Sequence, residues 1–234
     1  MTLDPVPRDP ALHPKGVNHL AISTGDMTAQ LAFFCDVLGL PLKALYWMHG
    51  VEGTYHGFVE LAPESYIAFV QHPENATDIQ WGVSHAGSPA APVTVGAMQH
   101  VAFHVDDLDD LLAMRDRLRD RGVQVMGPID HGFCQSMYFA GPEGLSLEVA
   151  CGAGIDERAW IDPEVQGLCG ISEQELGAMK APAAFARPSE PVPQPDFDPN
   201  GFNMHPAERY EKVMAIPDQD MWDNQSETTP PVQI

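Results

Sequence analysis

Hydrophobic and polar positions repeat along this chain in two long blocks. The segment 16–22, "GVNHLAI", resembles 97–103, "AMQHVAF", and both read as strands. In each block, the next segment spaces its apolar residues three and four apart, as an amphipathic helix does. These apolar residues are Met27, Leu31, Phe34 and Leu38 in the first block, and Leu108, Leu111, Leu112 and Leu118 in the second. Asp26 and Asp107 stand where a helix N-cap is expected.

Short strand-like runs follow each predicted helix, with turn residues between them. The runs are 42–48, 55–61 and 65–71 in the first block, and 123–127, 136–141 and 145–151 in the second. Each block therefore predicts a β-α-β-β-β module. One such module leaves a sheet face without a partner, so we expect an α+β fold in which two βαβββ modules form one cupped mixed sheet.

Proline content and chain length divide the sequence further. The modules are predicted at 14–71 and 97–154, and the connector at 72–96 is long enough to cover part of the molecule. Residues 155–234 form a proline-rich acidic extension, with a short helix expected at 206–216. Its tryptophans indicate an irregular segment that packs on the body in places, since disordered tails are usually poorer in aromatic residues.

Charge and composition narrow the function classes. The net charge is −21, with 18 acidic and 7 basic side chains in residues 1–154 and 15 and 5 in residues 155–234. Acidity on both halves disfavours binding to nucleic acid. The sequence has no apolar run long enough to span a membrane and no secretory leader at its beginning, and its four cysteines form no close pair. We therefore expect a cytoplasmic protein with reduced thiols.

Three residues stand out as metal ligands. His19 and His100 occupy the same place in the two blocks, 81 residues apart, and Glu148 interrupts the apolar run "LSLEVAC". A carboxylate in a buried strand is costly unless it is paired or bound to a cation. Two imidazoles and one carboxylate suit Fe(II) and are compatible with Mn, Zn, Ni or Co. The competing interpretation is two core histidines and a glutamate that is paired with arginine or lies at the sheet rim.

The stretch 98–105, "MQHVAFHV", contains a second histidine. His100 and His104 share a strand face but lie about 13 Å apart at the usual rise, so they cannot hold one metal in a regular strand. His104 is either a structural histidine or part of the pocket lining.

These modules, with "VNHLAI", "MQHVAFHVDD" and "YFAGPEGLSLEVAC", resemble the vicinal oxygen chelate superfamily of glyoxalases, bleomycin resistance proteins and type I extradiol dioxygenases. The resemblance covers about residues 14–153. It implies metal ligands on the first and last strands of each module, which here gives His19, His100 and Glu148. The matching place at the end of the first module holds Ala68 or Phe69, neither of which is a ligand. A glyoxalase I assignment is weakened accordingly, and the extradiol pattern fits better.

The resemblance also implies catalytic side chains. Tyr138 stands where extradiol enzymes hydrogen-bond the substrate, and His131 is similar to the histidine of the preceding loop. Extradiol enzymes also carry an acid–base histidine at the end of the first module, where this chain has Glu64 and Ser65. His56 is the predicted substitute, and His72 is a further candidate.

Three functions follow as hypotheses. The first is extradiol-like dioxygenase chemistry, with Fe(II) favoured, on a small-molecule substrate that chelates the metal through vicinal oxygens. The second is a metal-dependent lyase, isomerase or epimerase with Glu64 or His56 as base. The third is a metal-free binding protein. A homodimer is compatible with all three.

Overall fold

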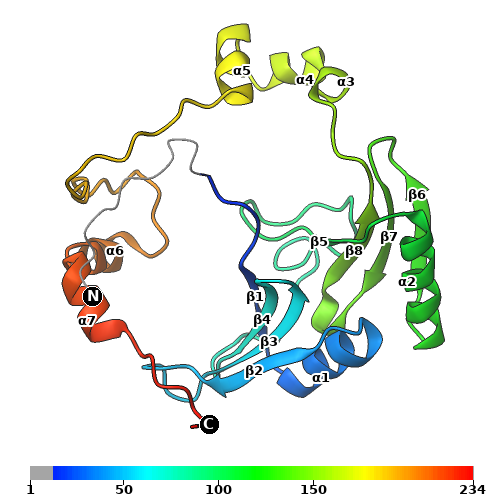
Figure 1. Cartoon of the computed structure of the whole chain (residues 1–234), viewed down its shortest axis with the longest axis horizontal. Helices are drawn as coiled ribbons and strands as arrows, with labels where there is room; N and C mark the ends of the chain where they lie inside the picture. Colours follow the sequence, from blue (N-terminus) through cyan, green and yellow to red (C-terminus); the bar gives the residue numbers. More distant parts are fainter. Residues whose placement is uncertain (1–12, 234) are drawn as a thin grey trace. The chain divides into compact units, whose positions relative to one another are not determined.

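The computed structural model describes residues 13–233 (Figure 1). The chain divides into two compact units, which are described separately below. One unit comprises residues 16–171 and contains both predicted modules, and the other comprises residues 172–233 together with 13–15.

The first module forms a mixed four-stranded sheet in the order β1-β4-β3-β2. Strand β1 runs parallel to β4, and the other neighbours are antiparallel. The helical segments α1 and η1, the second of which has π-helical hydrogen bonding, follow β1 in the chain. The elements are β1 (His19–Thr24), α1 (Met27–Ala32), η1 (Phe33–Val37), β2 (Leu42–Trp47), β3 (Tyr55–Ala62) and β4 (Ser65–Gln71).

The second module repeats this topology in the order β5-β8-β7-β6. Strand β5 is again parallel to the last strand, β8. The elements are β5 (Val101–His104), α2 (Leu108–Asp120), β6 (Val125–Asp130), β7 (Gln135–Ala140), the short 3-10 turn η2 (Pro142–Gly144) and β8 (Ser146–Cys151). The predicted pair of βαβββ modules is confirmed, although β5 begins later than expected and leaves His100 directly before the strand.

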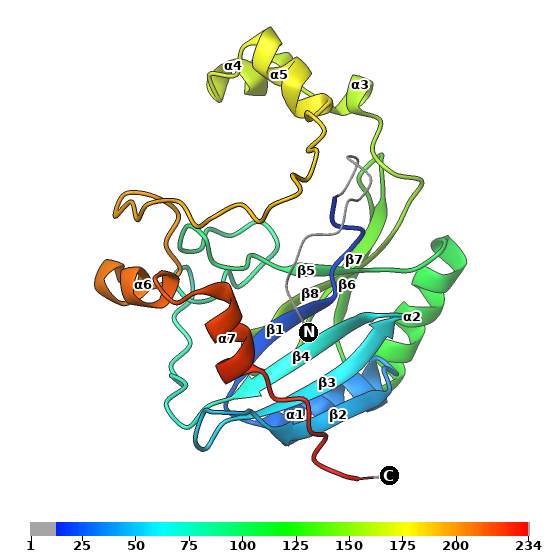
Figure 2. The same ribbon diagram turned by 60° about the vertical axis from the view of Figure 1, so that its left-hand side comes forward.

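Local sequence explains where the two helices begin. The carboxylate of Asp26 accepts a hydrogen bond from the Ala29 amide, and that of Asp107 accepts one from the Asp110 amide. Both are N-caps that satisfy an otherwise free backbone donor. Figure 2 shows α1 against the first sheet and α2 against the second.

A single hydrophobic core joins the modules. Phe34, which is fully buried, makes edge-to-face contacts with Phe69 at 4.9 Å and with Phe103 of the second module at 6.3 Å between ring centroids. Aromatic pairs of this geometry contribute beyond their buried area. The modules therefore pair within one chain.

Polar contacts also cross between the modules. The Arg117 guanidinium of α2 donates to the backbone carbonyls of Asp36 and Val37 at the end of η1. Near the beginning of α1, the carboxylate of Glu143 accepts hydrogen bonds from the Thr24 hydroxyl, the Gly25 amide and the Gln30 side chain. Glu143 lies in η2, so this turn is held against the beginning of α1.

The chain beyond the modules begins with α3 (Glu157–Trp160) and α4 (Pro163–Leu168), which belong to the compact unit of residues 16–171. Trp160 packs edge-on against Phe133, with ring centroids 4.8 Å apart. The second unit contains α5 (Glu173–Lys180), α6 (Ala207–Met214) and α7 (Asp218–Gln225). The helix expected at 206–216 is thus present as α6. Within residues 13–233, no helix combines the length and apolar character needed to cross a membrane.

Candidate metal centre

The candidate centre lies on one face of the second sheet, where Glu148 is the central residue. Alternation along β8 directs Leu147 and Val149 into the core and places Glu148 on the opposite face. Ala102 of β5 and Tyr138 of β7 lie directly beside Glu148 in the register of the sheet. The pairing of β8 with β5 on one side and with β7 on the other therefore places Glu148 next to the segment that carries His100 and beside Tyr138.

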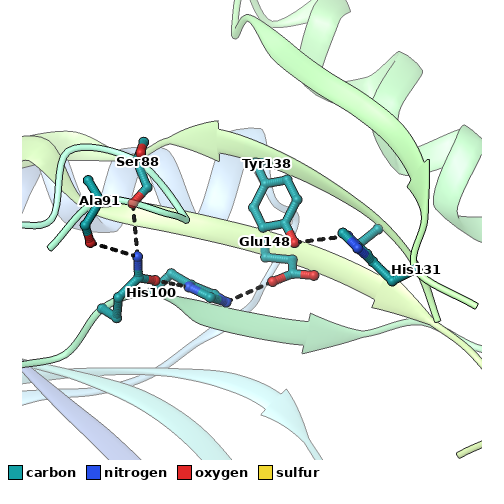
Figure 3. A network of polar contacts seen from close by, with 8 residues as sticks. Ser88, Ala91, His100, His131, Tyr138 and Glu148 are labelled. Carbon is teal, nitrogen blue, oxygen red and sulfur yellow. Dashed lines mark hydrogen bonds and ion pairs between the residues drawn. The ribbon is translucent and has the colours of Figure 1, made fainter. Parts of the chain in front are cut away.

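His100 and Glu148 form the innermost pair of the site (Figure 3). The His100 Nε2 atom lies 2.9 Å from Glu148 Oε2, and the side chain of Glu148 is only 7% exposed. The carboxylate predicted to need a partner has one in this imidazole.

This pair has the spacing of two neighbouring metal ligands. Nitrogen and oxygen ligands with bonds of about 2.1 Å at right angles lie about 3.0 Å apart. The 2.9 Å separation of His100 Nε2 and Glu148 Oε2 is that of a direct hydrogen bond and is also compatible with two adjacent positions around one divalent ion.

Tyr138 and His131 stand next to this pair. The Tyr138 hydroxyl is 3.3 Å from His131 Nε2, which also lies 3.1 Å from the Ser136 hydroxyl (Figure 3). Burial raises the pKa of the Tyr138 phenol, the charge of Glu148 raises it further, and the hydrogen bond with Ser136 opposes both. The net result is a phenol that keeps its proton and can donate a hydrogen bond at neutral pH.

A cavity of about 480 Å³ opens in front of these groups. Its polar lining residues include His100, His104, His131, Cys134, Tyr138 and Glu148. His104 lies further along the same face, as its strand position predicted. Burial, followed by the charge of Glu148, raises the pKa of the Cys134 thiol, so this cysteine is a poor nucleophile at neutral pH.

His19 and His56 lie elsewhere, on the face of the first sheet. The ring of His19 contacts Phe58 at 5.8 Å, and its Nδ1 atom lies 2.9 Å from the Asn18 side-chain oxygen. His56 packs against both Tyr46 and Phe58, with its Nε2 atom buried and without a hydrogen bond. Burial lowers the pKa of His56, and the neighbouring His19 lowers it further.

The structure thus brings together four of the six predicted site residues, His100, Glu148, Tyr138 and His131. His19 and His56 are not among the residues that line the 480 Å³ cavity. Across residues 13–233, no three His, Cys, Asp or Glu side chains are grouped so as to hold a metal. His19 as a third ligand therefore stays a prediction, as does His56 as an acid–base group. His72, the further candidate, accepts a hydrogen bond from the Glu74 amide in the loop after β4.

Sequence reasoning missed Gln99. Its side-chain oxygen contacts His100 Nδ1, and its NH2 group donates to the carbonyl oxygens of Ser88 and Ala91 in the connector. The adjacency of Gln99 to His100 was visible in the sequence. Its partners in the connector could not be predicted, because they are backbone carbonyls and the side-chain pattern does not identify them.

Comparison with known proteins bears on the family of this chain. The family model described as "Glyoxalase/Bleomycin resistance protein/Dioxygenase superfamily" matches residues 16–149. Biphenyl-2,3-diol 1,2-dioxygenase 3 of Rhodococcus globerulus is 38% identical over 132 residues, which cover 56% of this chain and 60% of that protein. A probable lactoylglutathione lyase of Synechocystis sp. is 28% identical over 134 residues, covering 56% of this chain and 91% of that protein.

The glyoxylase/bleomycin resistance protein/dioxygenase domain from Frankia sp. EAN1pec aligns over 60% of this chain and all of its own length, with 18% identity and a TM-score of 0.49. The chain spans about three fifths of the length of the dioxygenases that it matches. Because the family model matches more than half of the residues, this chain belongs to the glyoxalase/bleomycin resistance protein/dioxygenase superfamily.

Proposed function

We propose that this chain is a metal-dependent enzyme that oxidises a small substrate with two adjacent oxygens, in the manner of a dioxygenase. The observation that carries the proposal is the buried carboxylate of Glu148 paired with the half-buried His100, at a separation that two ligands of one ion would have and with a cavity in front of it. A buried carboxylate without arginine or lysine beside it is typical of a cation site.

The metal would be held by His100 and Glu148, with His19 as the predicted third ligand. Fe(II) is favoured, and Mn, Zn, Ni or Co suit the same donors. When bound, such an ion supplies a Lewis-acid or redox centre for a chelating substrate. Residues of the chain would orient the substrate and transfer protons. The Tyr138 hydroxyl donates a hydrogen bond to a substrate oxygen, and His131, 3.3 Å from it, accepts or returns a proton.

Two features favour a dioxygenase over a lyase. Two of the similar curated proteins are biphenyl-2,3-diol 1,2-dioxygenases, at 27% and 38% identity. In addition, β4 presents Tyr66 and Ala68 on the face that carries His19 in β1, so the last strand of the first module offers no carboxylate there. A metal site that takes four ligands, two from each module, would therefore lack one ligand in this chain.

The test is an oxygen-dependent assay. Protein loaded anaerobically with Fe(II) is mixed with a panel of substituted catechols, and O2 uptake and ring-fission chromophores are followed. We expect one O2 consumed per substrate, with both oxygen atoms in the ring-opened product, and loss of the reaction in Glu148→Gln. Metal-loaded protein that consumes no O2 with any catechol would contradict the dioxygenase proposal.

His19 is tested in the same assay. If it is the third ligand, His19→Ala weakens Fe(II) binding and lowers turnover, whereas the exposed His49→Ala leaves both unchanged. Unchanged metal affinity in His19→Ala would remove this residue from the ligand set.

A second candidate is a lyase or isomerase. It is favoured by the match to the probable lactoylglutathione lyase, which this chain covers over 91% of that protein's length. In that case, activity persists with Zn or Ni and without O2, and lactoylglutathione is formed or consumed. A protein that binds small molecules but no metal would exclude both enzymes and leave the binding-protein hypothesis.

A further inference from the structure

Gln99 links the connector to the candidate metal centre. Its Nε2 atom donates to the Ser88 carbonyl at 2.9 Å and to the Ala91 carbonyl at 3.4 Å. Its Oε1 atom contacts His100 Nδ1, and His100 in turn contacts Glu148 through Nε2. Figure 3 shows these contacts as one continuous chain from the connector to Glu148.

The hydrogen-bonding properties of these groups determine the direction of each bond. A backbone carbonyl oxygen only accepts, so the NH2 end of Gln99 must face Ser88 and Ala91. The Oε1 atom is then left toward His100, and because this oxygen also only accepts, His100 Nδ1 must carry a proton. The connector therefore selects which end of the Gln99 amide meets the histidine.

A proton on Nδ1 leaves Nε2 as the nitrogen available to a metal. This is the atom that lies 2.9 Å from Glu148 Oε2. Metal-bound histidines usually donate their other ring N–H to such an outer acceptor, which fixes the ring orientation and makes the ligand nitrogen more basic. The Nε2 and carboxylate atoms at this distance also need a positive centre between them, either a proton or a metal ion.

We infer that Gln99 is a positioning residue for the metal site, which holds the proton on His100 Nδ1 and presents Nε2 to the ion, with its own orientation set by the connector carbonyls of Ser88 and Ala91. The part of this inference that concerns metal binding rests on the proposed function. The part that concerns the proton on Nδ1 does not.

Three variants test the role of Gln99 in metal binding: Gln99→Leu, Gln99→Glu and the exposed control Gln124→Leu. Leucine removes the acceptor, whereas glutamate keeps an acceptor oxygen for His100 and loses the donors to the connector. Zn(II) is the probe, because it accepts the same donors and is diamagnetic. We expect Gln99→Leu to weaken Zn(II) affinity about 10- to 100-fold, Gln99→Glu to weaken it less than Gln99→Leu, and the control to be unchanged.

The second readout is the ring proton itself, observed by 15N NMR of histidine-labelled protein with and without Zn(II). In the wild type, we expect an exchange-protected proton on His100 Nδ1, and in Gln99→Leu we expect that protection to be lost. A protected proton found on Nε2 alone would overturn the inference, and this measurement needs no variant. A folded Gln99→Leu that binds Zn(II) within twofold of wild type would overturn the positioning role.

Failure of the proposed function gives a different result. A wild-type protein that binds no Zn(II) overturns the metal site and the role of Gln99 in it, while the site of the ring proton still decides the hydrogen-bond assignment. If Gln99→Leu does not fold, the wild-type proton position decides the inference: a proton on Nδ1 supports it, and a proton on Nε2 alone contradicts it.

Discussion

At the residue scale, the candidate site depends on one buried carboxylate, Glu148, and a few half-buried polar groups around it on one sheet face. Glu148 has His100 on one side and Tyr138 beside it on β7. Strand alternation predicted which of these residues share a face. Strand alternation could not place His19, because its position relative to the second sheet depends on how one module packs against the other. It also could not reveal the role of Gln99, because the partners of Gln99 lie 8 and 11 residues back in the connector.

Replacing Tyr138 tests its proposed role in substrate binding most directly. Tyr138→Phe removes one hydroxyl and keeps the ring, so we expect kcat/KM for the oxidised substrate to fall about 100-fold, the cost of losing one well-placed donor. Metal affinity should stay unchanged, because the hydroxyl is not a ligand. Steady-state kinetics and metal titration check this, with Tyr55→Phe on the first sheet as the control. Equal activity of Tyr138→Phe and wild type would exclude Tyr138 from catalysis.

At the element scale, the two modules use the turn before their last strand for different purposes. Both Glu64, between β3 and β4, and Glu143, between β7 and β8, have left-handed backbone conformations, with φ of 59° and 52°. Of these two residues, only Glu143 contacts the other module through its carboxylate, which accepts hydrogen bonds at the beginning of α1. The sequence predicted both turns, but not that one of them would fasten the modules together.

Removing the charge of Glu143 should destabilise the protein in a pH-dependent way. Burial opposes ionisation of this carboxyl, but the hydrogen bonds from Thr24, Gln30 and Gly25 outweigh it and lower its pKa. A group whose pKa is lowered on folding stabilises the native state above its unfolded pKa of about 4.3 and loses that contribution as the pH falls through the folded value. We expect Glu143→Gln to lower the free energy of unfolding by about 1–3 kcal/mol at pH 7.

Urea denaturation at pH 7 and at successive values below pH 4 measures this difference. The gap between wild type and Glu143→Gln should narrow as the pH falls, while the exposed control Glu52→Gln shows neither effect. A gap that stays constant down to pH 3 would mean that the ionised carboxylate is not the source of the stabilisation.

At the scale of the molecule, internal repetition made the fold predictable. The 81-residue offset between His19 and His100 indicated two modules, and the structure has two sheets of identical topology. Whether the modules pair within one chain depends on side-chain packing between distant segments, which periodicity does not specify. Phe34, in contact with aromatic residues of both modules, provides that packing.

Because this core is shared, both modules should unfold together. Phe34→Ala leaves a cavity at the centre and should lower the free energy of unfolding by about 3–5 kcal/mol. When wild-type protein unfolds in urea, fluorescence and circular dichroism should report one coincident transition for the unit that contains both modules, residues 16–171. Two separated transitions, or a loss below about 1 kcal/mol in Phe34→Ala, would show that the modules are energetically independent.

The central claim is that His100 and Glu148 hold a divalent metal. The most direct measurement is the metal content and affinity of the purified protein, determined by elemental analysis and by calorimetric titration with Fe(II) under anaerobic conditions and with Zn(II). The candidate centre predicts one ion per chain, lost or bound at least about 100-fold more weakly in His100→Ala and Glu148→Gln, since removing a ligand costs more than removing its outer partner. Wild-type protein that binds no divalent metal, or variants that bind it as tightly as wild type, would contradict the assignment of this site.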